Sequence, residues 1–325
     1  MADPLLQTFQ LKHLHLKNRI ITTSHEPAYN EGGFPKDRYI AYHLERARGG
    51  IAMTMTAGSA VVSKDSPPSF DNIHAYKDEV VPWIKKLTDT IHDQDCKIMI
   101  QLTHLGRRTS WSKGDWLPSL SSGKHREPAH KAFPKVMESW DIERIIKEYG
   151  DAAERMKLGG MDGVELEGQG HLIGQFLSPL TNELNSEYGG SLENRLRFTI
   201  EVLSDIRKKV GQDFIVGIRC VFDEVEEGGI TKSEGLKIAK ILSDSGLVDY
   251  LNVNKGRIHT DPILTKHIPI QGMKSAPHLE FAGEIKKEIN IPIFHASKIS
   301  DVATARYAIS NGLVDMIGMT RGHLA

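Results

Sequence analysis

The sequence predicts an α/β fold of the (β/α)8 TIM barrel type, in which eight parallel strands alternate with outer helices. The chain has 325 residues, a length suited to one large barrel or to two smaller domains. Short β-rich runs alternate with helical segments along the whole chain, and no linker rich in glycine, serine and proline interrupts them. A doubly wound parallel sheet is the alternative that this alternation leaves open.

The β-rich runs number eight, which is the count that a (β/α)8 barrel needs. In chain order they are NRIITTS (18–24), IAMTMTAGS (51–59), KIMIQL (97–102), DGVELEG (162–168), FIVGIRC (214–220), DYLNVNK (249–255), IPIFHAS (291–297) and DMIGMTR (315–321). The helical segments between them include VVPWIKKLTDTIHD (80–93), DIERIIKEYGDAAERMK (141–157) and SDVATARYAISN (300–311).

Two irregularities interrupt this pattern. A long segment, 103–138, separates the third strand from its helix and carries Trp111, Trp116, several prolines and many basic residues. Loops of that length in a compact domain are usually functional. The chain stops at TRGHLA, just past the eighth strand, so the last outer helix is lacking and an apolar flank is left uncovered. We therefore expect residues 1–325 to form one barrel domain, the N-terminal part of a longer chain.

The composition excludes several classes of protein. The 41 basic and 42 acidic residues give a net charge of -1, which argues against a nucleic-acid binder or a membrane-surface protein. The N-terminus lacks the regions of a secretory signal, and no apolar run is long enough to span a bilayer. Two cysteines, Cys96 and Cys220, cannot build a disulfide framework, a four-thiolate zinc site or an iron–sulfur cluster. We expect a cytoplasmic homo-oligomer whose barrel holds no metal.

In a (β/α)8 barrel the functional groups lie at the carboxyl ends of the strands. The first six ends carry polar or charged side chains, and the last two, HASK and MTRG, carry Lys298 and Arg321 beside small residues. Small residues let backbone N–H groups approach a phosphate, while the two cations balance its charge. Each cation alone could equally be a solvated charge flanking a helix. Their matching places on adjacent strands indicate a phosphate site.

Three motifs carry a resemblance to a known family that covers essentially the whole chain. They are LKNRI (16–20), QLTHLGRR (101–108) and QFLSPLTNELNSEYGGSLENRLRF (175–198). The chain resembles the FMN-dependent old yellow enzyme family, and within it the branch of trimethylamine dehydrogenase, 2,4-dienoyl-CoA reductase and the methylamine and betaine demethylases. The longest motif serves as scaffold: Ser191 is suited to cap the next helix, and Glu193 lies in its first turn, where the helix dipole favours an acid.

The resemblance implies a site for FMN at the strand ends. Ser24 and His25 would lie along the flavin, and Gly58 would let the ring approach the second strand. Gln101 would hydrogen-bond the pyrimidine edge, and Arg219 would stabilise the negative charge that appears on N1 and O2 upon reduction. Taken singly, Gln101 could be a barrel-interior amide and Arg219 an ion-pair partner, but their joint placement favours the flavin. The implied phosphate-binding residues are Ser297, Lys298, Thr320 and Arg321.

This chain departs from the family pattern at three of these positions. Glycine commonly stands in the family where this chain has Ser297 and Thr320. Glu26 stands where trimethylamine dehydrogenase has the cysteine that is joined covalently to its flavin, so the resemblance implies noncovalent FMN. Glu26 either forms an electronegative substrate pocket together with Glu167 or caps a local turn.

The segment ELEGQGH (165–171) departs further from the pattern of the family. Strand alternation directs Glu165 and Glu167 into the barrel, with Glu167 nearer the strand end. Old yellow enzymes usually carry a His…His or His…Asn pair here, followed by a proton-donating tyrosine, and His171 matches the position of that tyrosine. An ionised carboxylate cannot donate a hydrogen bond to an enone oxygen, but it suits a cationic substrate. We therefore expect Glu167 and His171 to bind the substrate and to act in catalysis.

The expected reaction is oxidative N-demethylation of a small methylated amine or betaine. The lone pair of a secondary or tertiary amine drives hydride from an N-methyl carbon to flavin N5, and water hydrolyses the iminium to formaldehyde and the demethylated amine. A quaternary betaine lacks that lone pair and would need another route. His171 and His259 are candidates to hold or move protons, because imidazole titrates near neutral pH. His259 could equally be a loop-surface residue, and His104 could serve only to orient its loop.

Two alternatives remain at this stage. The first is NAD(P)H-dependent reduction of an activated alkene, as in 2,4-dienoyl-CoA reductase, with His171 replacing tyrosine as proton donor. The second is a flavin-binding module that has lost its chemistry. If the protein is a demethylase, its electrons pass either to a separate protein acceptor or to a C-terminal part of a longer chain. That C-terminal part, which is not present in these residues, would hold a 4Fe-4S cluster and a dinucleotide. Trp111 and Trp116 either add cation–π contacts to the substrate or anchor their loop.

Overall fold

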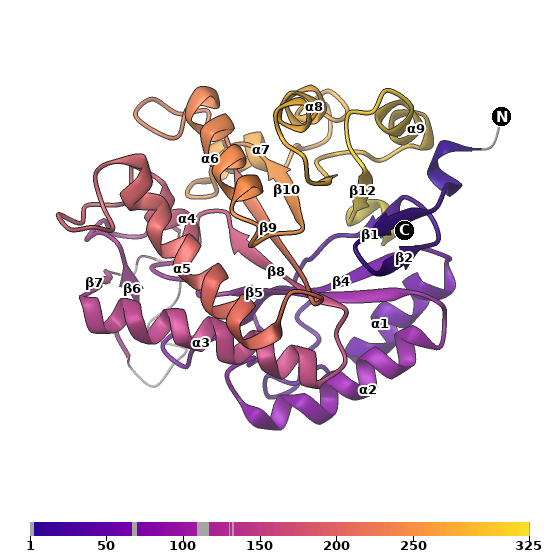
Figure 1. The fold of residues 1–325 in the computed structure, drawn as a ribbon, viewed down its shortest axis with the longest axis horizontal. Coiled ribbons are helices and arrows are strands. Elements are labelled where there is room, and N and C mark those ends of the chain that lie inside the picture. The colour runs from indigo at the N-terminus through magenta and orange to yellow at the C-terminus, as the bar shows by residue number, and fades with distance from the viewer. Residues whose placement is uncertain (1–2, 67–69, 109–116, 130, 132, 325) are drawn as a thin grey trace.

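The computed structural model describes residues 3–66, 70–108, 117–129, 131 and 133–324, and the tryptophans of the long loop, Trp111 and Trp116, lie outside these ranges. Eight parallel strands close into one barrel, which confirms the predicted fold (Figure 1). In pairing order they are β3 (Ile20–Thr22), β4 (Met53–Val61), β5 (Lys97–Thr103), β8 (Gly163–Gly168), β9 (Ile215–Val221), β10 (Tyr250–Asn254), β11 (Ile293–His295) and β12 (Met316–Met319). Strand β12 pairs with β3 and closes the barrel. Each predicted β-rich run overlaps one of these strands.

Helices between successive strands cover the outside of the barrel (Figure 1). They are α1 (Asp37–Arg48), α2 (Val81–His92), α3 (Ser139–Leu158), α5 (Leu192–Val210), α6 (Lys232–Asp244), α8 (Leu279–Glu288) and α9 (Val302–Ser310). The connections also hold the short helices α4 (Leu172–Leu177) and α7 (Asp261–His267), the 3-10 turn η2 (Asp78–Val80), and the paired strands β6 (Leu120–Ser121) and β7 (Lys135–Val136). Another 3-10 turn, η1 (Pro4–Leu6), precedes the first strand. After β12 the described chain forms the 3-10 turn η4 (Arg321–His323). No helix of the described residues is long and apolar enough to cross a bilayer.

The barrel interior has a core of its own, and a hairpin closes one end of it. The hairpin consists of β1 (Phe9–Leu11) and β2 (Leu14–Leu16), whose leucines pack against the inward side chains Met53 and Ile215 at the starts of their strands. Tyr250 stacks on Phe294 within this core, with ring centroids 4.0 Å apart. Because the apolar hairpin covers the amino ends of the strands, the carboxyl ends remain for a functional site.

The long family motif forms the start of α5 as its sequence predicts. Ser191 is the N-cap residue, and its Oγ accepts a hydrogen bond of 3.3 Å from the backbone N–H of Asn194. Glu193 lies in the first turn, where a negative charge interacts favourably with the helix dipole. The motif therefore fixes the helix that packs behind β8 and leaves the chemistry to the strand ends.

Candidate active site

Glu165 lies at the centre of a hydrogen-bonded layer inside the barrel. Its fully buried carboxyl accepts hydrogen bonds from Gln101 Nε2 at 2.8 Å, Tyr250 Oη at 3.0 Å and Asn252 Nδ2 at 3.0 Å. Burial raises the pKa of Glu165, and the nearby Arg219 together with these three donors opposes the rise. Because one N–H of the Gln101 amide is used by Glu165, Gln101 can offer a flavin its other N–H as a donor and its carbonyl oxygen as an acceptor.

Glu167 lies one layer nearer the carboxyl end of β8, as strand alternation predicts. Its carboxyl accepts hydrogen bonds from Gln169, at 2.6 Å from the backbone N–H and 3.4 Å from the side-chain amide. Burial raises the pKa of Glu167 to about 8, although Arg219 on the adjacent strand lowers it. The group is therefore mostly protonated at neutral pH, and a cationic ligand would favour its ionised form.

His171 ends the turn that begins at Glu167. It is the N-cap residue of α4, it is buried, and its Nδ1 lies 3.1 Å from Oγ1 of Thr103 at the end of β5. This contact ties the turn after β8 to the neighbouring strand. The sequence-predicted pair, Glu167 and His171, therefore lies within one buried turn.

The segment after β3 brings Ser24, His25 and Glu26 to the same end of the barrel. Tyr42 Oη lies within hydrogen-bonding distance, 2.5 Å, of His25 Nε2, and burial lowers the pKa of His25, so the imidazole is neutral. Glu26 Oε1 accepts a hydrogen bond of 3.0 Å from the backbone N–H of Ala28, which is the local turn cap that the sequence left open. Burial nevertheless raises the pKa of Glu26 to about 8.

Several buried polar atoms at these strand ends test whether FMN fits. Among the described residues, the side-chain atoms here that are buried without a hydrogen-bond partner include Ser24 Oγ, His25 Nδ1, Glu26 Oε2, Arg219 Nε and His295 Nε2. An unpaired buried polar group costs about 1–3 kcal/mol, so such a cluster is expected where a polar ligand completes the hydrogen bonding. Donors and acceptors are both present, as the edge of a flavin ring requires. The residues therefore fit the cofactor.

The backbone packs so closely at Gly58 that no larger residue fits there. A Cβ atom there would lie 2.7 Å from the backbone nitrogen of Glu26, closer than real contacts allow. Strand β4 and the segment after β3 can therefore approach each other only with glycine at this position. This explains the glycine by a backbone contact, while contact with the flavin ring stays a prediction.

The predicted phosphate residues gather where β11 and β12 end. Ser297 has φ of 107° and Lys298 has φ of 54°, so both adopt the left-handed backbone that favours glycine, which is the residue the family commonly has at Ser297. The hydroxyl groups of Thr320 and Thr23 are hydrogen-bonded to each other, which connects the end of β12 to the end of β3. The Nζ of Lys298 and the guanidinium of Arg321 donate to carbonyls of one loop, those of Ile270, Met273 and Pro269. Both cations thus lie together, but each already has a backbone partner.

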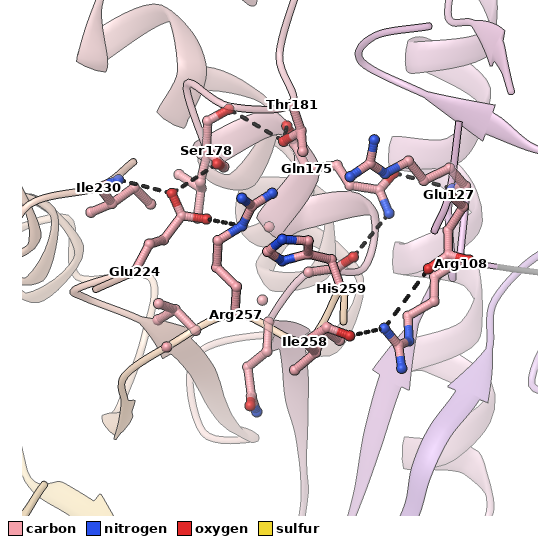
Figure 2. A pocket seen from close by; sticks show the side chains of 18 residues that line it. Arg108, Glu127, Gln175, Ser178, Thr181, Glu224, Ile230, Arg257, Ile258 and His259 are labelled. Carbon is pink, nitrogen blue, oxygen red and sulfur yellow. Dashed lines mark hydrogen bonds and ion pairs between the residues drawn. The ribbon is translucent and has the colours of Figure 1, made fainter. Parts of the chain in front are cut away.

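Beside the turn after β8 lies a pocket that sequence patterns did not predict (Figure 2). Its lining includes Arg107 and Arg108 from the loop after β5, and Arg257 and His259 from the loop after β10. His259 Nε2 is 3.8 Å from Glu226 Oε2, and burial together with Arg257 lowers the pKa of His259. His259 therefore lies among arginines, in neutral form, and not among the strand-end side chains of the flavin cluster.

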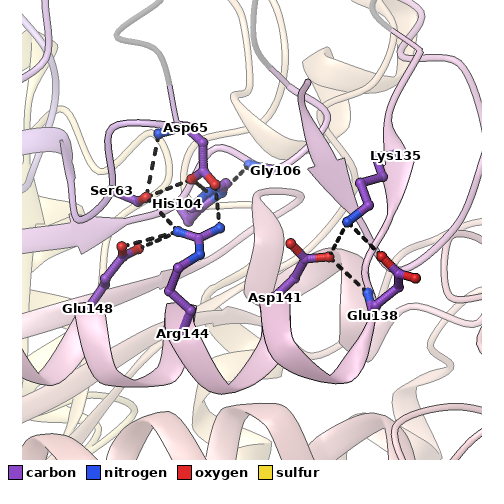
Figure 3. A network of polar contacts seen from close by, with 9 residues as sticks. All are labelled: Ser63, Asp65, His104, Gly106, Lys135, Glu138, Asp141, Arg144 and Glu148. Atoms are coloured by element: carbon purple, nitrogen blue, oxygen red, sulfur yellow. Dashed lines mark hydrogen bonds and ion pairs between the residues drawn. The ribbon is translucent and has the colours of Figure 1, made fainter. Parts of the chain in front are cut away.

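A second unpredicted feature is the polar network around His104 (Figure 3). Its Nδ1 accepts a hydrogen bond of 3.0 Å from the N–H of Gly106, so its Nε2 carries the proton and donates to Asp65 Oδ1 at 2.9 Å. Arg144 on α3 pairs with the other oxygen of Asp65. The network joins the loops after β4 and β5 to α3, so His104 orients the loop that carries Arg107 and Arg108.

No group of three or more histidine, cysteine, aspartate or glutamate side chains in the described ranges is placed to hold a metal ion. Cys96 and Cys220 are both free and buried. Burial raises the pKa of Cys96 to about 12, so its thiol is not a nucleophile near neutral pH. The polar chemistry of this end of the barrel is therefore that of carboxyls, imidazoles and guanidinium groups.

Comparison with known proteins identifies relatives of this chain. The model of the NADH:flavin oxidoreductase / NADH oxidase family matches residues 4–325. The chain is 66% identical over 322 residues to the "Probable N-methylproline demethylase" of Rhizobium meliloti (strain 1021), covering 99% of this chain and 48% of that protein. It is 46% identical over 325 residues to the "Multifunctional alkene reductase/demethylase OYE" of Caballeronia cordobensis, covering 100% of this chain and 48% of that protein.

Among solved structures, the complex of 2-naphthoyl-CoA reductase with 2-naphthoyl-CoA matches with a TM-score of 0.91 and 27% identity, over 99% of this chain and 50% of that chain. The chain spans about half the length of the two curated relatives named above, 48% of each. Because the family match extends over nearly all of its residues, the chain belongs to the NADH:flavin oxidoreductase / NADH oxidase family, the old yellow enzyme family of FMN-dependent oxidoreductases.

Proposed function

We propose that this barrel oxidatively demethylates a small N-methylated amino acid of the N-methylproline type. The observation that carries the proposal is the buried carboxyl of Glu167 at the strand ends, beside His171, where a cationic nitrogen would find a partner. The 66% identical relative named for N-methylproline demethylation supports the substrate class. Bound FMN would accept a hydride from the N-methyl carbon, and water would convert the iminium product to formaldehyde and the demethylated amine.

The raised pKa of Glu167 suits it to the proton chemistry. A substrate ammonium has a pKa of roughly 10, like a lysine side chain, and must lose its proton before the nitrogen lone pair can drive hydride loss. A carboxyl with an ordinary pKa near 4.5 would be a poor base for that proton, whereas burial raises the pKa of Glu167 to about 8. Glu167 therefore binds the cation and takes its proton, and His171 holds or moves the proton onward.

FMN would be held noncovalently by the strand-end residues. Its binding residues are Ser24, His25, Gly58, Gln101, Arg219, Ser297, Lys298, Thr320 and Arg321. The unpaired buried atoms of Ser24 and Arg219 support the ring site, and the left-handed backbone at Ser297 and Lys298 supports the phosphate site. Acid precipitation of the holoenzyme should release all the flavin into solution. Flavin retained on the polypeptide would contradict noncovalent binding.

A second candidate function is alkene reduction, because the 46% identical relative is named as both an alkene reductase and a demethylase. The two functions differ in what reduces the flavin. In the demethylase, anaerobic addition of N-methyl-L-proline alone bleaches the flavin absorbance. In the alkene reductase, NADPH bleaches it, an enone restores it, and the amine leaves it unchanged.

The electrons taken from the substrate must leave the barrel. We expect them to pass to an iron–sulfur cluster and a dinucleotide in a further part of a longer protein, since the curated relatives are about twice as long as this chain, which spans 48% of each. The measurement that tests this is the iron content and reduced-minus-oxidised spectrum of the full gene product. A gene product without iron would contradict it.

A further inference from the structure

Two loops place three arginines around the pocket in Figure 2, and like charges so close together need anionic partners. Arg107 and Arg108 come from the loop after β5, and Arg257 comes from the loop after β10. Gly168 and Gly170 line the same pocket and add no side chain to fill it. The three arginines differ in the partners that the protein itself gives their guanidinium groups.

Arg257 has carboxylate partners on two sides. Its Nε lies 3.2 Å from Glu224 Oε1, and its guanidinium lies 2.9 Å from Glu226 Oε2. Arg107 has a scaffold contact: its guanidinium donates to the backbone carbonyl of His125 at 3.1 Å. This contact holds the Arg107 side chain against its own loop, and the negative charges of Glu127 and Glu183 act on its guanidinium.

Arg108 reaches from the loop after β5 to the loop after β10. Its guanidinium donates to the carbonyl of Ile258, and its ion pair with Glu127 is long, at 4.0 Å. The side chain is 16% exposed, so it is largely removed from water while its counter-ion is distant. A guanidinium in that state gains more from a close anion than a solvated one does, because the dielectric screening around it is low.

Glu167 does not itself line this pocket, but the charges of Glu167 and Arg108 act on each other, so the two side chains are close. Gln169 lines this pocket, and its backbone N–H and side-chain amide both donate to the Glu167 carboxyl. A buried acid and a weakly paired cation therefore lie on either side of one residue. Such an arrangement would suit a small molecule that carries both a cationic nitrogen and a carboxylate.

We propose that Arg108 binds the carboxylate of the N-methylated amino acid whose nitrogen is bound at Glu167. The inference rests on the proposed function and adds the residue that selects amino acids over plain amines. A guanidinium can bind a carboxylate through two parallel N–H···O hydrogen bonds, and the contact with Ile258 holds its side chain in place. Arg257, already paired with Glu224 and Glu226, fixes the loop that presents Ile258.

The experiment compares ligands with and without the carboxylate in the holoenzyme and in Arg108→Met. Binding is measured first with unreactive ligands, L-proline and pyrrolidine, from the change that each causes in the flavin absorbance. Turnover is measured next with N-methyl-L-proline and N-methylpyrrolidine. We expect the substitution to weaken L-proline binding by about 10- to 150-fold, as expected for loss of a charge-assisted contact, and to leave pyrrolidine binding unchanged. The kcat/KM for N-methyl-L-proline should fall in parallel.

Two control variants show whether weaker L-proline binding comes from losing the paired geometry of Arg108 or from losing any arginine. Arg108→Lys keeps the charge but loses the paired geometry, so its affinity for L-proline should lie between those of wild type and Arg108→Met. Arg48→Met removes an exposed arginine of α1, whose side chain is 57% exposed, and should leave both ligands unaffected. Full FMN content and unchanged pyrrolidine binding in Arg108→Met show that the variant is folded.

The failure of this inference and the failure of the proposed function give different results. If neither N-methylated compound bleaches the wild-type flavin, the demethylase function is wrong, while the ratio of L-proline to pyrrolidine affinity still reports on Arg108. If that ratio is the same in wild type and in Arg108→Met, carboxylate recognition by Arg108 is wrong. A variant that loses FMN or binds both ligands equally worse would assign Arg108 a structural role and would also overturn the inference.

Discussion

Glu167 on β8 and Arg219 on β9 are direct register partners, so an acid and an arginine occupy neighbouring positions at the carboxyl end of the barrel. Arg219 lowers the pKa of Glu167 against the opposing effect of burial. The two residues that the sequence assigned to substrate and to flavin are therefore electrostatically coupled. Changing either one should alter the behaviour of the other.

Replacement of Arg219 by methionine should lower the reduction potential of the bound flavin. A charge-assisted contact is worth about 1.5–3 kcal/mol, which corresponds to about 30–65 mV for a two-electron couple. The measurement is a spectroscopic redox titration of the holoenzyme. An unchanged potential would remove Arg219 from the flavin site. Arg219→Lys, which keeps the charge, is the matched control and should retain most of the wild-type potential.

Replacement of Glu167 by glutamine should weaken amine binding by about 10- to 150-fold while leaving FMN content intact. Free Glu167 is protonated below its pKa of about 8 and becomes the carboxylate that binds a cation above it. Wild-type affinity for the ammonium form should therefore rise as the pH increases through about 8, and Glu167→Gln should lack this rise.

A second carboxyl could also make amine affinity depend on pH near 8. Burial also raises the pKa of Glu26 to about 8, so Glu26→Gln is measured beside Glu167→Gln. If amine affinity still rises with pH in Glu167→Gln but no longer rises in Glu26→Gln, the substrate contact belongs to Glu26. That result would contradict the role given to Glu167.

Replacement of His171 by phenylalanine should slow flavin reduction by the amine by at least about 100-fold, the usual contribution of a positioned acid or base. Thr103→Val removes the hydroxyl that lies 3.1 Å from His171 Nδ1 and should cause a smaller decrease in the same rate. Stopped-flow measurement of flavin bleaching gives both rates. Loss of FMN from both variants, with unaltered rates for the flavin that remains, would indicate that His171 only supports the loop.

The Asp65 network should contribute to stability in a pH-dependent way (Figure 3). Burial would raise the pKa of Asp65, but hydrogen bonds from His104 and Ser63 and the charge of Arg144 outweigh it and hold the pKa well below its usual range. The stabilisation is therefore complete above the unfolded-state pKa near 4 and is lost as the pH falls through the folded-state pKa.

Asp65→Asn should accordingly lower the free energy of unfolding by about 1.5–3 kcal/mol near pH 7. Urea denaturation of wild type and variant at several pH values gives the difference between them. That difference should narrow below about pH 4, where the wild-type Asp65 begins to protonate in the unfolded chain. A difference that stays constant with pH would show that the network acts through packing and not through the charge of Asp65.

Each β-rich run overlaps one strand of the barrel, and the polar residues at the strand ends must meet at one rim. The alternation of strands and helices favoured this barrel but by itself left a doubly wound sheet open. It also predicted that Glu165 and Glu167 face inward, since side chains alternate along a strand. The cap formed by Ser191 was predictable because it depends on residues only three apart in sequence.

The pocket and the His104 network could not be predicted in this way. Arg108 meets Ile258 across 150 residues, and Arg144 meets Asp65 across 79, so no local pattern records either contact. Arg108 lies inside a motif that identified the family, and its chemistry becomes visible only once the loop after β10 lies against it. The backbone partners of Lys298 and Arg321 are likewise supplied by a loop that sequence spacing does not bring to them.

The central claim is that the methyl group on the substrate nitrogen is the group oxidised. The most direct measurement adds N-methyl-L-proline carrying a carbon-13 label in its methyl group to the oxidised holoenzyme without oxygen, and follows both flavin bleaching and trapped formaldehyde. The account predicts one labelled formaldehyde and one L-proline for each flavin reduced. Bleaching without labelled formaldehyde would place the oxidation on a ring carbon and would contradict the demethylase function.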